Sequence, residues 1–237
     1  MSLIFAHRGA SAAKRENTCA AFREARRLGA DGVELDVRRN ADGALVVHHD
    51  AAIAGRPILE MTVADLPEDV PLLEAALASC QPMTVNIEIK NLPTEADFDP
   101  EETLAEGVAH LVAELDLLAS VLVSSFNLAT VDAVRRAEPK LATGWLTVAQ
   151  LDQHRALATA AERGHAALHP HHRAVSEALV AEAHGRGLAI NTWTVDDPER
   201  MAELARWGVD SIITNRVDVA IETLRGEGKG ADRERPA

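Results

Sequence analysis

The sequence has few cysteines and no tyrosine. Its two cysteines, Cys19 and Cys80, are too few for a disulfide framework or a cysteine zinc site, and we expect both to be small buried hydrophobic residues. No stretch approaches the roughly 20 consecutive apolar residues of a membrane span. The first residues lack the basic segment and long apolar run of a signal peptide, so we expect a cytoplasmic protein without stable membrane insertion.

Positive charge is also scarce. The chain has 24 Lys and Arg against 37 Asp and Glu, which gives a formal net charge of -13. Because the phosphates of nucleic acids require a basic face, we expect no nucleic-acid partner. A few local cations would still suffice to hold a small phosphate-containing substrate.

Short apolar segments alternate with helical segments along the 237 residues. We expect strands near residues 3, 33, 84, 120, 141, 166, 188 and 210. Eight such units, each followed by a helix or crossover, predict the α/β class and a (β/α)8 TIM barrel. We expect one domain over residues 1–225 and a disordered, polar, glycine-rich tail over residues 226–237.

Acidic side chains follow the strand period in two places. Side chains alternate faces along a strand, so Glu34 and Asp36 share one face of the second strand, and Glu88 and Lys90 share one face of the third. Three carboxylates that face into a barrel repel one another and lose hydration unless a cation neutralises them. We therefore expect one divalent cation, and oxygen ligands without cysteine favour Mg²⁺ or Ca²⁺.

The segment after the second strand is expected to return toward these acids. An Asp-Gly turn signal precedes residues 44–48, which we expect to form a hairpin arm on the second strand. The arm delivers His48 and His49, and we expect His49 to face the acids while His48 alternates away. Residues 51–71 contain Gly and Pro at several positions and are expected to be a short loop insertion.

The first predicted strand ends in His7 and Arg8, where a barrel places its catalytic groups. Arg8 and Lys90 supply fixed positive charge suited to a phosphate. His7 and His49 can transfer protons near neutral pH, since imidazole titrates there. These roles favour phosphodiester hydrolysis, although His7 taken alone could equally be a structural strand-end histidine bonded to the backbone.

Several motifs together resemble the signature of the glycerophosphodiester phosphodiesterase family. They are His7-Arg8-Gly9, Glu16-Asn17-Thr18, Gly32-Val33-Glu34-Leu35-Asp36-Val37, Asp42-Gly43, Val46-Val47-His48-His49-Asp50 and Ile87-Glu88-Ile89-Lys90. The later segments 124–127, 193–195 and 210–215 are similar to that family too, so the resemblance covers about residues 3–216.

The resemblance implies metal-dependent hydrolysis of a glycerophosphodiester to glycerol 3-phosphate and an alcohol. It implies a divalent ion on Glu34, Asp36 and Glu88, an acid–base pair of His7 and His49, and phosphate ligands Arg8 and Lys90. Glu16 would lie at the rim, oriented toward Arg8 or the substrate. Many relatives have a larger insertion where this chain has residues 51–71.

The remaining aromatic and histidine residues are expected at different places in the barrel. Trp193, at a strand end that faces the mouth, is expected to line the leaving-group pocket. We expect Phe22, Phe126 and Trp207 in the core or in helix packing. The cluster His169-Pro170-His171-His172 is expected in a solvated loop, with adventitious metal binding as the alternative.

Two other functions stay open. A lysophospholipase D or cyclising phospholipase would use the same metal and histidines but needs an apolar groove, and 3% aromatic residues show no obvious one. A non-catalytic phosphate-binding barrel is disfavoured because both candidate histidines and all three acids are present. The preferred alcohol, the choice between Mg²⁺ and Ca²⁺, and the oligomeric state stay open.

Overall fold

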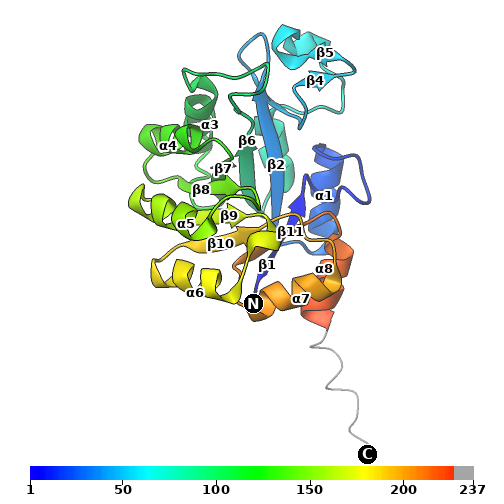
Figure 1. The fold of residues 1–237 in the computed structure, drawn as a ribbon. Helices are drawn as coiled ribbons and strands as arrows, with labels where there is room; N and C mark the ends of the chain where they lie inside the picture. The colour runs from blue at the N-terminus through cyan, green and yellow to red at the C-terminus, as the bar shows by residue number, and fades with distance from the viewer. Residues whose placement is uncertain (227–237) are drawn as a thin grey trace, which may run out of the picture.

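Eight parallel strands pair side by side in a closed ring (Figure 1). They are β1 (Leu3–His7), β2 (Gly32–Arg39), β6 (Thr84–Ile89), β7 (Val121–Ser125), β8 (Ala142–Thr147), β9 (Ala167–Pro170), β10 (Ala189–Thr192) and β11 (Ser211–Thr214). In this computed structural model, which describes residues 1–226, β1 pairs with both β2 and β11 and so closes the ring. The predicted (β/α)8 barrel is confirmed, with a strand at each of the eight expected places.

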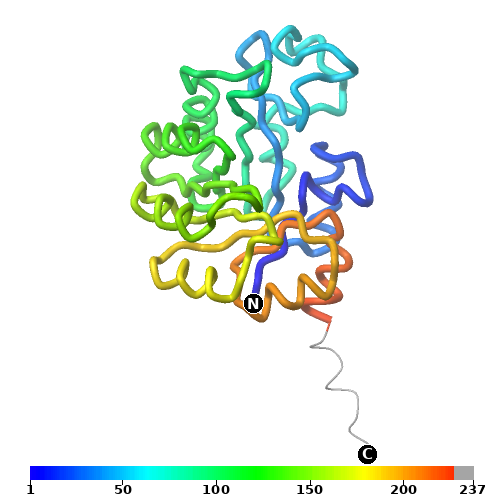
Figure 2. The backbone as a smooth tube through the Cα atoms, viewed as in Figure 1, coloured from blue at the N-terminus to red at the C-terminus, as the bar shows by residue number. Residues whose placement is uncertain are grey.

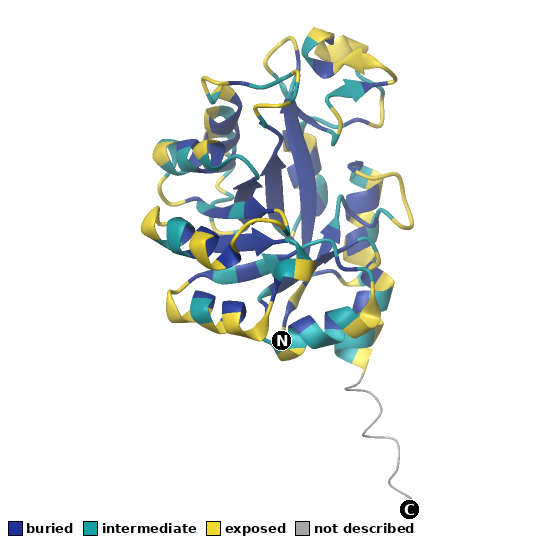
Figure 3. Cartoon of the chain, viewed as in Figure 1, coloured by how far each residue is buried: buried dark blue, intermediate teal, exposed yellow. Residues whose placement is uncertain are grey.

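A helix follows every barrel strand and covers the outside of the ring. The helices are α1 (Cys19–Leu28), α2 (Leu73–Cys80), α3 (Thr103–Glu114), α4 (Leu128–Ala137), α5 (Gln153–Glu162), α6 (Glu177–Gly185), α7 (Pro198–Arg206) and α8 (Val217–Arg225). Figure 3 shows buried strands and helices whose outward faces are exposed. Among the described residues, no helix combines the length and the apolar character needed to cross a membrane.

Helix α1 shows how local sequence sets these boundaries. The Thr18 side chain accepts a hydrogen bond from the backbone N–H of Ala21, which caps the first turn. Gly29 ends the helix in the left-handed conformation, with a φ of 89°. Phe22 lies on the buried face and is fully buried, as predicted. These caps set the length of the helix that connects β1 to β2.

The insertion after β2 is more ordered than the loop that we predicted. The hairpin arm is confirmed, because β3 (Leu45–Val47) pairs antiparallel with the end of β2. Beyond it lie β4 (Ala52–Ile53), β5 (Arg56–Pro57), η1 (Ile58–Glu60) and η2 (Val63–Asp65). Ile53, Ile58, Met61 and Val70 pack with Val46 in a small apolar cluster of their own. Figure 2 shows this segment, in cyan, at one end of the barrel beyond the end of β2.

Some placements differ from the sequence expectations. Cys80 is buried as expected, but Cys19 is only half-buried. Trp207 packs against the core, with the guanidinium of Arg200 4.7 Å from its ring centre. Apart from Gly226, the predicted tail of residues 226–237 lies outside the described residues.

Candidate active site

Three buried acids from neighbouring strands meet near the carboxyl end of the barrel. Glu34 and Asp36 share one face of β2, and Asp36 is the register partner of Glu88 on β6. One carboxylate oxygen from each of the three lies within 4.8 Å of the others. The relative exposures of the residues are 3%, 0% and 8%. The structure therefore brings together the three predicted metal ligands.

These acids strongly perturb one another. Burial raises the pKa of Glu34 well above its ordinary value, and the charges of Asp36 and Glu88 raise it further. Burial also raises the pKa of Glu88, to about 7, against the opposing charge of Lys90. Burial acts in the same direction on Asp36, but Lys90 and Arg8 outweigh it and lower the pKa of that acid. An additional positive charge would therefore stabilise the ionised forms of Glu34 and Glu88.

The donor set fits a hard divalent cation. All three side chains offer carboxylate oxygens, which are the ligands that Mg²⁺ and Ca²⁺ prefer. The Oε1 atom of Glu34 is buried without a hydrogen-bond partner, so it is free to serve as a ligand. Within residues 1–226, this is the cluster of acids, histidines or cysteines that is compact enough for an ion.

Two predicted phosphate ligands lie directly against the acids. Lys90 Nζ is 3.0 Å from Asp36 Oδ1 and also pairs with Glu88. Arg8 Nε is 3.3 Å from Asp36 Oδ2, and Arg8 Nη1 is 2.9 Å from Glu16 Oε1. Glu16 therefore lies at the rim beside Arg8, in the place that the motif predicted.

A left-handed turn after β1 holds Arg8 in position. Arg8 has a φ of 57° and Gly9 a φ of 80°, and the left-handed conformation costs a non-glycine residue roughly 1–2 kcal/mol. The backbone N–H of Arg8 donates to Glu34 Oε2 at 2.9 Å. A Cβ atom on Gly9 would lie 2.8 Å from the carbonyl carbon of Ala21. Glycine is required here, because α1 approaches the turn so closely.

Asn17 fixes the orientation of Asp36, a role that the sequence motif did not reveal. Its Nδ2 donates to Asp36 Oδ2 at 2.7 Å, and its Oδ1 accepts from the Asp36 backbone N–H at 3.3 Å. Its own backbone N–H donates to the carbonyl oxygen of Arg8 at 2.9 Å. Asn17 thereby joins the turn after β1 to the acid on β2.

His7 is held by a side chain from the far end of the sequence. Its Nδ1 lies 2.7 Å from Asn215 Oδ1, and its Nε2 lies 3.9 Å from Glu34 Oε2. Asn215 Nδ2 donates to Asp196 Oδ2 at 2.7 Å, so its oxygen faces His7. Neutral His7 therefore carries its proton on Nδ1 and presents an unprotonated Nε2 toward the acids. Burial, followed by the charge of Arg8, lowers the pKa of His7.

Asn215 and Asp196 were not among the predicted site residues. Asp196 accepts hydrogen bonds from the Asn215 backbone N–H and from the Thr214 hydroxyl, each at 2.9 Å. The available signal was the 210–215 segment, which the family resemblance included without a role for any single residue. The contact of Asn215 with His7 spans the closure of the ring between β11 and β1, which strand periodicity does not describe.

His49 and His48 lie side by side beyond the hairpin arm. His49 Nδ1 is 2.7 Å from Asp50 Oδ1, and His49 is close enough to Asp36 to help lower its pKa. His48 Nδ1 lies 2.9 Å from the carbonyl oxygen of Asp50 instead. Both imidazoles are half-buried and line a hollow of about 230 Å³ together with Glu16.

Aromatic side chains gather at the ends of β7 and β10. Trp193 meets the ring of Phe126 edge to face at 5.3 Å and the ring of His171 at 5.1 Å. Its indole N–H donates to the carbonyl oxygen of His169 at 2.9 Å. Phe126 is half-buried and lies outside the hydrophobic core, which was one of the two places expected for it. Both residues directly follow their strands, and their rings meet at this end of the barrel.

The expectation of a solvated loop is wrong for His169. This residue lies within β9, is fully buried and accepts a hydrogen bond on Nε2 from Asn191 Nδ2 at 2.9 Å. Burial lowers its pKa to about 3. Its ring fills the space beside Gly144, where an added Cβ would lie 2.5 Å from Nε2. His171 and His172 are half-buried, with ring centres 4.6 Å apart.

The fold and the site together define a class of barrel enzyme. Clustered acids suited to a divalent cation, fixed cations suited to a phosphate, and imidazoles suited to proton transfer are the parts of a phosphoric ester hydrolase. The sequence profile of the glycerophosphoryl diester phosphodiesterase family matches residues 7–219. The chain belongs to this family and is a phosphoric diester hydrolase.

Relatives match along nearly their whole length. The glycerophosphodiester phosphodiesterase of Caldanaerobacter subterraneus subsp. tengcongensis is 31% identical over 245 residues, 96% of this chain and 99% of the relative. The crystal structure of the Thermotoga maritima glycerophosphodiester phosphodiesterase is 26% identical with a TM-score of 0.81, covering 95% of this chain and 99% of that one. An Oleispira antarctica phosphodiesterase, solved with the product sn-glycerol-3-phosphate, shares the fold at 22% identity, with a TM-score of 0.79 and coverage of 94% and 97%.

Proposed function

We propose that this protein hydrolyses glycerophosphodiesters to glycerol 3-phosphate and an alcohol. The supporting observation is the position of His7, whose unprotonated Nε2 lies 3.9 Å from Glu34 in a cluster that Arg8 and Lys90 also contact. A proton acceptor, phosphate-binding cations and metal-ligating oxygens thus share one site. Membership of the family supports glycerol diesters as the substrate class.

We infer that Glu34, Asp36 and Glu88 hold one divalent cation, either Mg²⁺ or Ca²⁺. When bound, the ion would stabilise the negative charge that develops on the phosphoryl oxygens. With Arg8 and Lys90, the three carboxylates and the ion carry a net charge of about one positive unit. A phosphodiester monoanion balances that charge, and the more negative transition state gains further from it.

The remaining residues bind and orient the substrate. Arg8 and Lys90 contact the phosphoryl oxygens, and Glu16 holds the guanidinium of Arg8 from the rim. Trp193, with Phe126 against it, lines the pocket of the leaving alcohol. In this arrangement the charged groups recognise the phosphoryl group and the aromatic side chains contact the less polar part of the substrate.

His7 and His49 form the acid–base pair. Because the pKa of His7 is lowered, His7 is neutral and its Nε2 accepts the proton of the attacking oxygen. That oxygen belongs to water or to the neighbouring hydroxyl of the glycerol, which has an entropic advantage as an internal nucleophile. Attack by water gives glycerol 3-phosphate directly, whereas attack by the hydroxyl expels the alcohol and forms a cyclic phosphate, which water then opens to glycerol 3-phosphate. His49, hydrogen-bonded to Asp50, donates a proton to the leaving alcohol oxygen.

A coupled assay for glycerol 3-phosphate release tests the proposal. We expect release from glycerophosphocholine, glycerophosphoethanolamine and glycerophosphoglycerol with modest mutual preference, and poor cleavage of bis(4-nitrophenyl) phosphate. Failure on every glycerol diester, together with choline release from lysophosphatidylcholine, would move the assignment to a lysophospholipase D.

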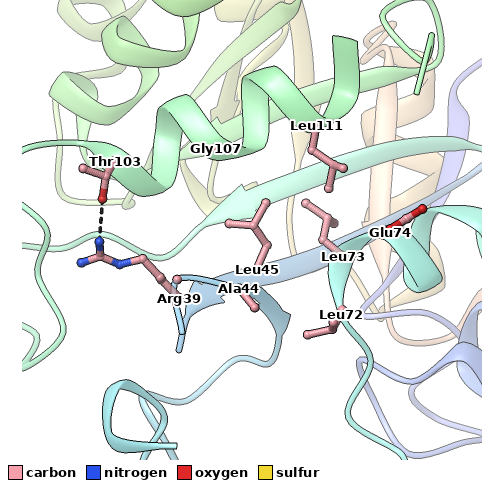
Figure 4. Close-up of a pocket in the computed structure, with 10 residues that line it drawn as sticks. Arg39, Ala44, Leu45, Leu72, Leu73, Glu74, Thr103, Gly107 and Leu111 are labelled. Atoms are coloured by element: carbon pink, nitrogen blue, oxygen red, sulfur yellow. Dashed lines mark hydrogen bonds between the residues drawn. The ribbon is translucent and has the colours of Figure 1, made fainter. Parts of the chain in front are cut away.

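The structure offers that second function little support. An apolar groove of about 340 Å³ is present, but Leu45, Leu72 and Leu111 line it on the outer side of the barrel (Figure 4). None of the candidate site residues is among its lining residues. A net charge of -13 further supports the absence of a nucleic-acid partner.

A further inference from the structure

Arg38 is a fully buried cation that the proposed mechanism does not use. It lies on β2 two residues after Asp36 and therefore on the same face of the strand. Its relative exposure is 1%, and it is the largest fully buried side chain among residues 1–226. A buried guanidinium loses its hydration, so its contacts must replace water at each donor.

The guanidinium of Arg38 joins three separate segments. Nε donates to the backbone carbonyl oxygen of His49 at 2.8 Å. Nη1 and Nη2 each donate to one carboxylate oxygen of Glu95 at 3.2 Å, and Nη1 also donates to Asp97 at 2.5 Å. β2, the segment that carries His49 and the segment after β6 are thus held by one planar group.

His49 needs such support because it lies outside the regular sheet. The antiparallel ladder between β2 and β3 ends at the pair Val37 and Val47. One further backbone bond, from the His48 N–H to the Asp36 carbonyl oxygen at 3.0 Å, continues it. The next carbonyl, that of His49, is bound by Arg38. The Arg38 side chain therefore provides the next hydrogen bond to this segment after the strand pairing ends.

We infer that Arg38 is a positioning residue that holds the imidazole of His49 in register with the acids. This inference rests on the proposed role of His49 as proton donor. Glu95 and Asp97 fix the plane of the guanidinium, and its Nε then fixes the carbonyl of His49. A lysine in this place has one ammonium group and cannot reproduce the fork that serves all three partners.

Arg39 provides a matched control on the same strand. It is the next residue, so its side chain points to the opposite face of β2, where Nη1 donates to Thr103 Oγ1 at 2.7 Å. Figure 4 shows it in the groove outside the barrel. Arg39→Met removes an arginine with a hydrogen bond of its own, but no contact with His49.

The first experiment compares the turnover of Arg38→Met and Arg39→Met on glycerophosphocholine. We expect Arg38→Met to lower kcat by about 10- to 100-fold while KM stays within about threefold, because a misplaced catalytic group slows chemistry more than binding. Affinity for Mg²⁺ or Ca²⁺ by isothermal titration should be unchanged in Arg38→Met. Arg39→Met should keep the kcat of the unmodified protein.

A double-mutant cycle separates positioning from general stability. If Arg38 acts through His49, adding Arg38→Met to His49→Ala should lower single-turnover rates no further than about twofold. An equal loss in both backgrounds would overturn the inference. Should Arg38→Met not fold, Arg38→Lys keeps the charge that Glu95 and Asp97 require and enters the same cycle, with the same two outcomes.

Chemical rescue supplies a second readout. Free guanidinium at non-denaturing concentration should restore part of the kcat of Arg38→Ala, since it can occupy the space of the missing group, and should leave His49→Ala unchanged. Absence of rescue in folded Arg38→Ala would contradict the inference. Failure of the proposed function is distinguishable, because the unmodified protein would then release no glycerol 3-phosphate. The Arg38 inference depends instead on the rates of the variants relative to the unmodified protein, measured with whichever phosphodiester that protein cleaves.

Discussion

The imidazole of His7 and the amide of Asn215 share a 2.7 Å hydrogen bond across 208 residues of sequence. Asn215 is itself oriented by Asp196, so the chain Asp196, Asn215, His7 selects one tautomer of the imidazole. The protonated Nδ1 is used for this bond, and Nε2 is left for chemistry.

Asn215→Ala should lower kcat by about tenfold or more, since His7 loses the partner that fixes its ring and tautomer. The loss should be smaller than that of His7→Ala. Ser11→Ala is the control, because the Ser11 hydroxyl donates to the same Asn215 oxygen at 3.0 Å. Steady-state kinetics on glycerophosphocholine measures both variants. Equal kcat for Asn215→Ala and Ser11→Ala would contradict a positioning role.

Loss of either proposed acid–base residue should lower kcat far more than loss of the neighbouring His48. His7→Ala and His49→Ala should each lower kcat by about two to four orders of magnitude, the usual value of a positioned acid or base. His48→Ala should stay within a few-fold, because its Nδ1 faces the backbone of Asp50. If His48→Ala were the inactive variant and His49→Ala active, the assignment of the two histidines would have to be exchanged.

Metal dependence should follow the three acids. Glu34→Gln, Asp36→Asn and Glu88→Gln should each abolish metal-dependent hydrolysis without unfolding the barrel, and chelation should inactivate the unmodified protein reversibly. Isothermal titration with Mg²⁺ and Ca²⁺ measures the loss of binding directly. Glu24→Gln is the control, since Glu24 pairs with Arg27 on the outer face of α1. Undiminished ion affinity in all three acid variants would refute the assignment.

The buried His169 predicts a specific dependence of stability on pH. Its pKa is about 3 in the folded protein and about 6.5 when unfolded. Below pH 6.5 the unfolded chain binds a proton that the folded protein does not, so stability is present above that pH and is lost as the pH falls. One such group contributes about 1.4 kcal/mol per pH unit.

His169→Gln should remove that contribution while keeping an acceptor for Asn191. The free energy of unfolding decreases between about pH 7 and about pH 5. This decrease should be smaller in the variant than in the unmodified protein, by roughly 2 kcal/mol. Urea unfolding at the two pH values measures the difference. An identical slope in His169→Gln would show that the buried imidazole is not the source.

Strand parity predicted the acidic centre of the site. Glu34, Asp36 and Glu88 follow a period of two within short strands, and neighbouring parallel strands then bring them together in register. The eight strands were predictable for the same reason, because apolar segments recur at a regular spacing. The order around the ring followed from the short crossovers between them.

Contacts between distant segments were the ones that could not be predicted. Arg38 reaches Glu95 and Asp97 across 57 and 59 residues, and no local period encodes such a pairing. The sequence predicted an exposed His169 because a histidine-rich segment usually lies in solvent. The burial of His169 depends on Asn191, a hydrogen-bond partner inside the barrel that is distant in the sequence. The short strands and 3-10 turns of residues 51–71 are not predictable from the sequence, because Gly and Pro residues interrupt the spacing of Ile53 and Ile58.

The proposed reactive groups are unevenly spread along the chain. His7, Arg8, Glu34, Asp36, His49, Glu88 and Lys90 all come from the first 90 residues, on β1, β2, β6 and the segments that directly follow β1, β3 and β6. Trp193 and Phe126 come from the segments after β10 and β7. The proposed reactive groups and the aromatic residues proposed to contact the alcohol therefore come from different parts of the sequence. Exchanging the segment after β7, which carries Phe126, between relatives should therefore change which alcohol is accepted without replacing any of the proposed reactive groups.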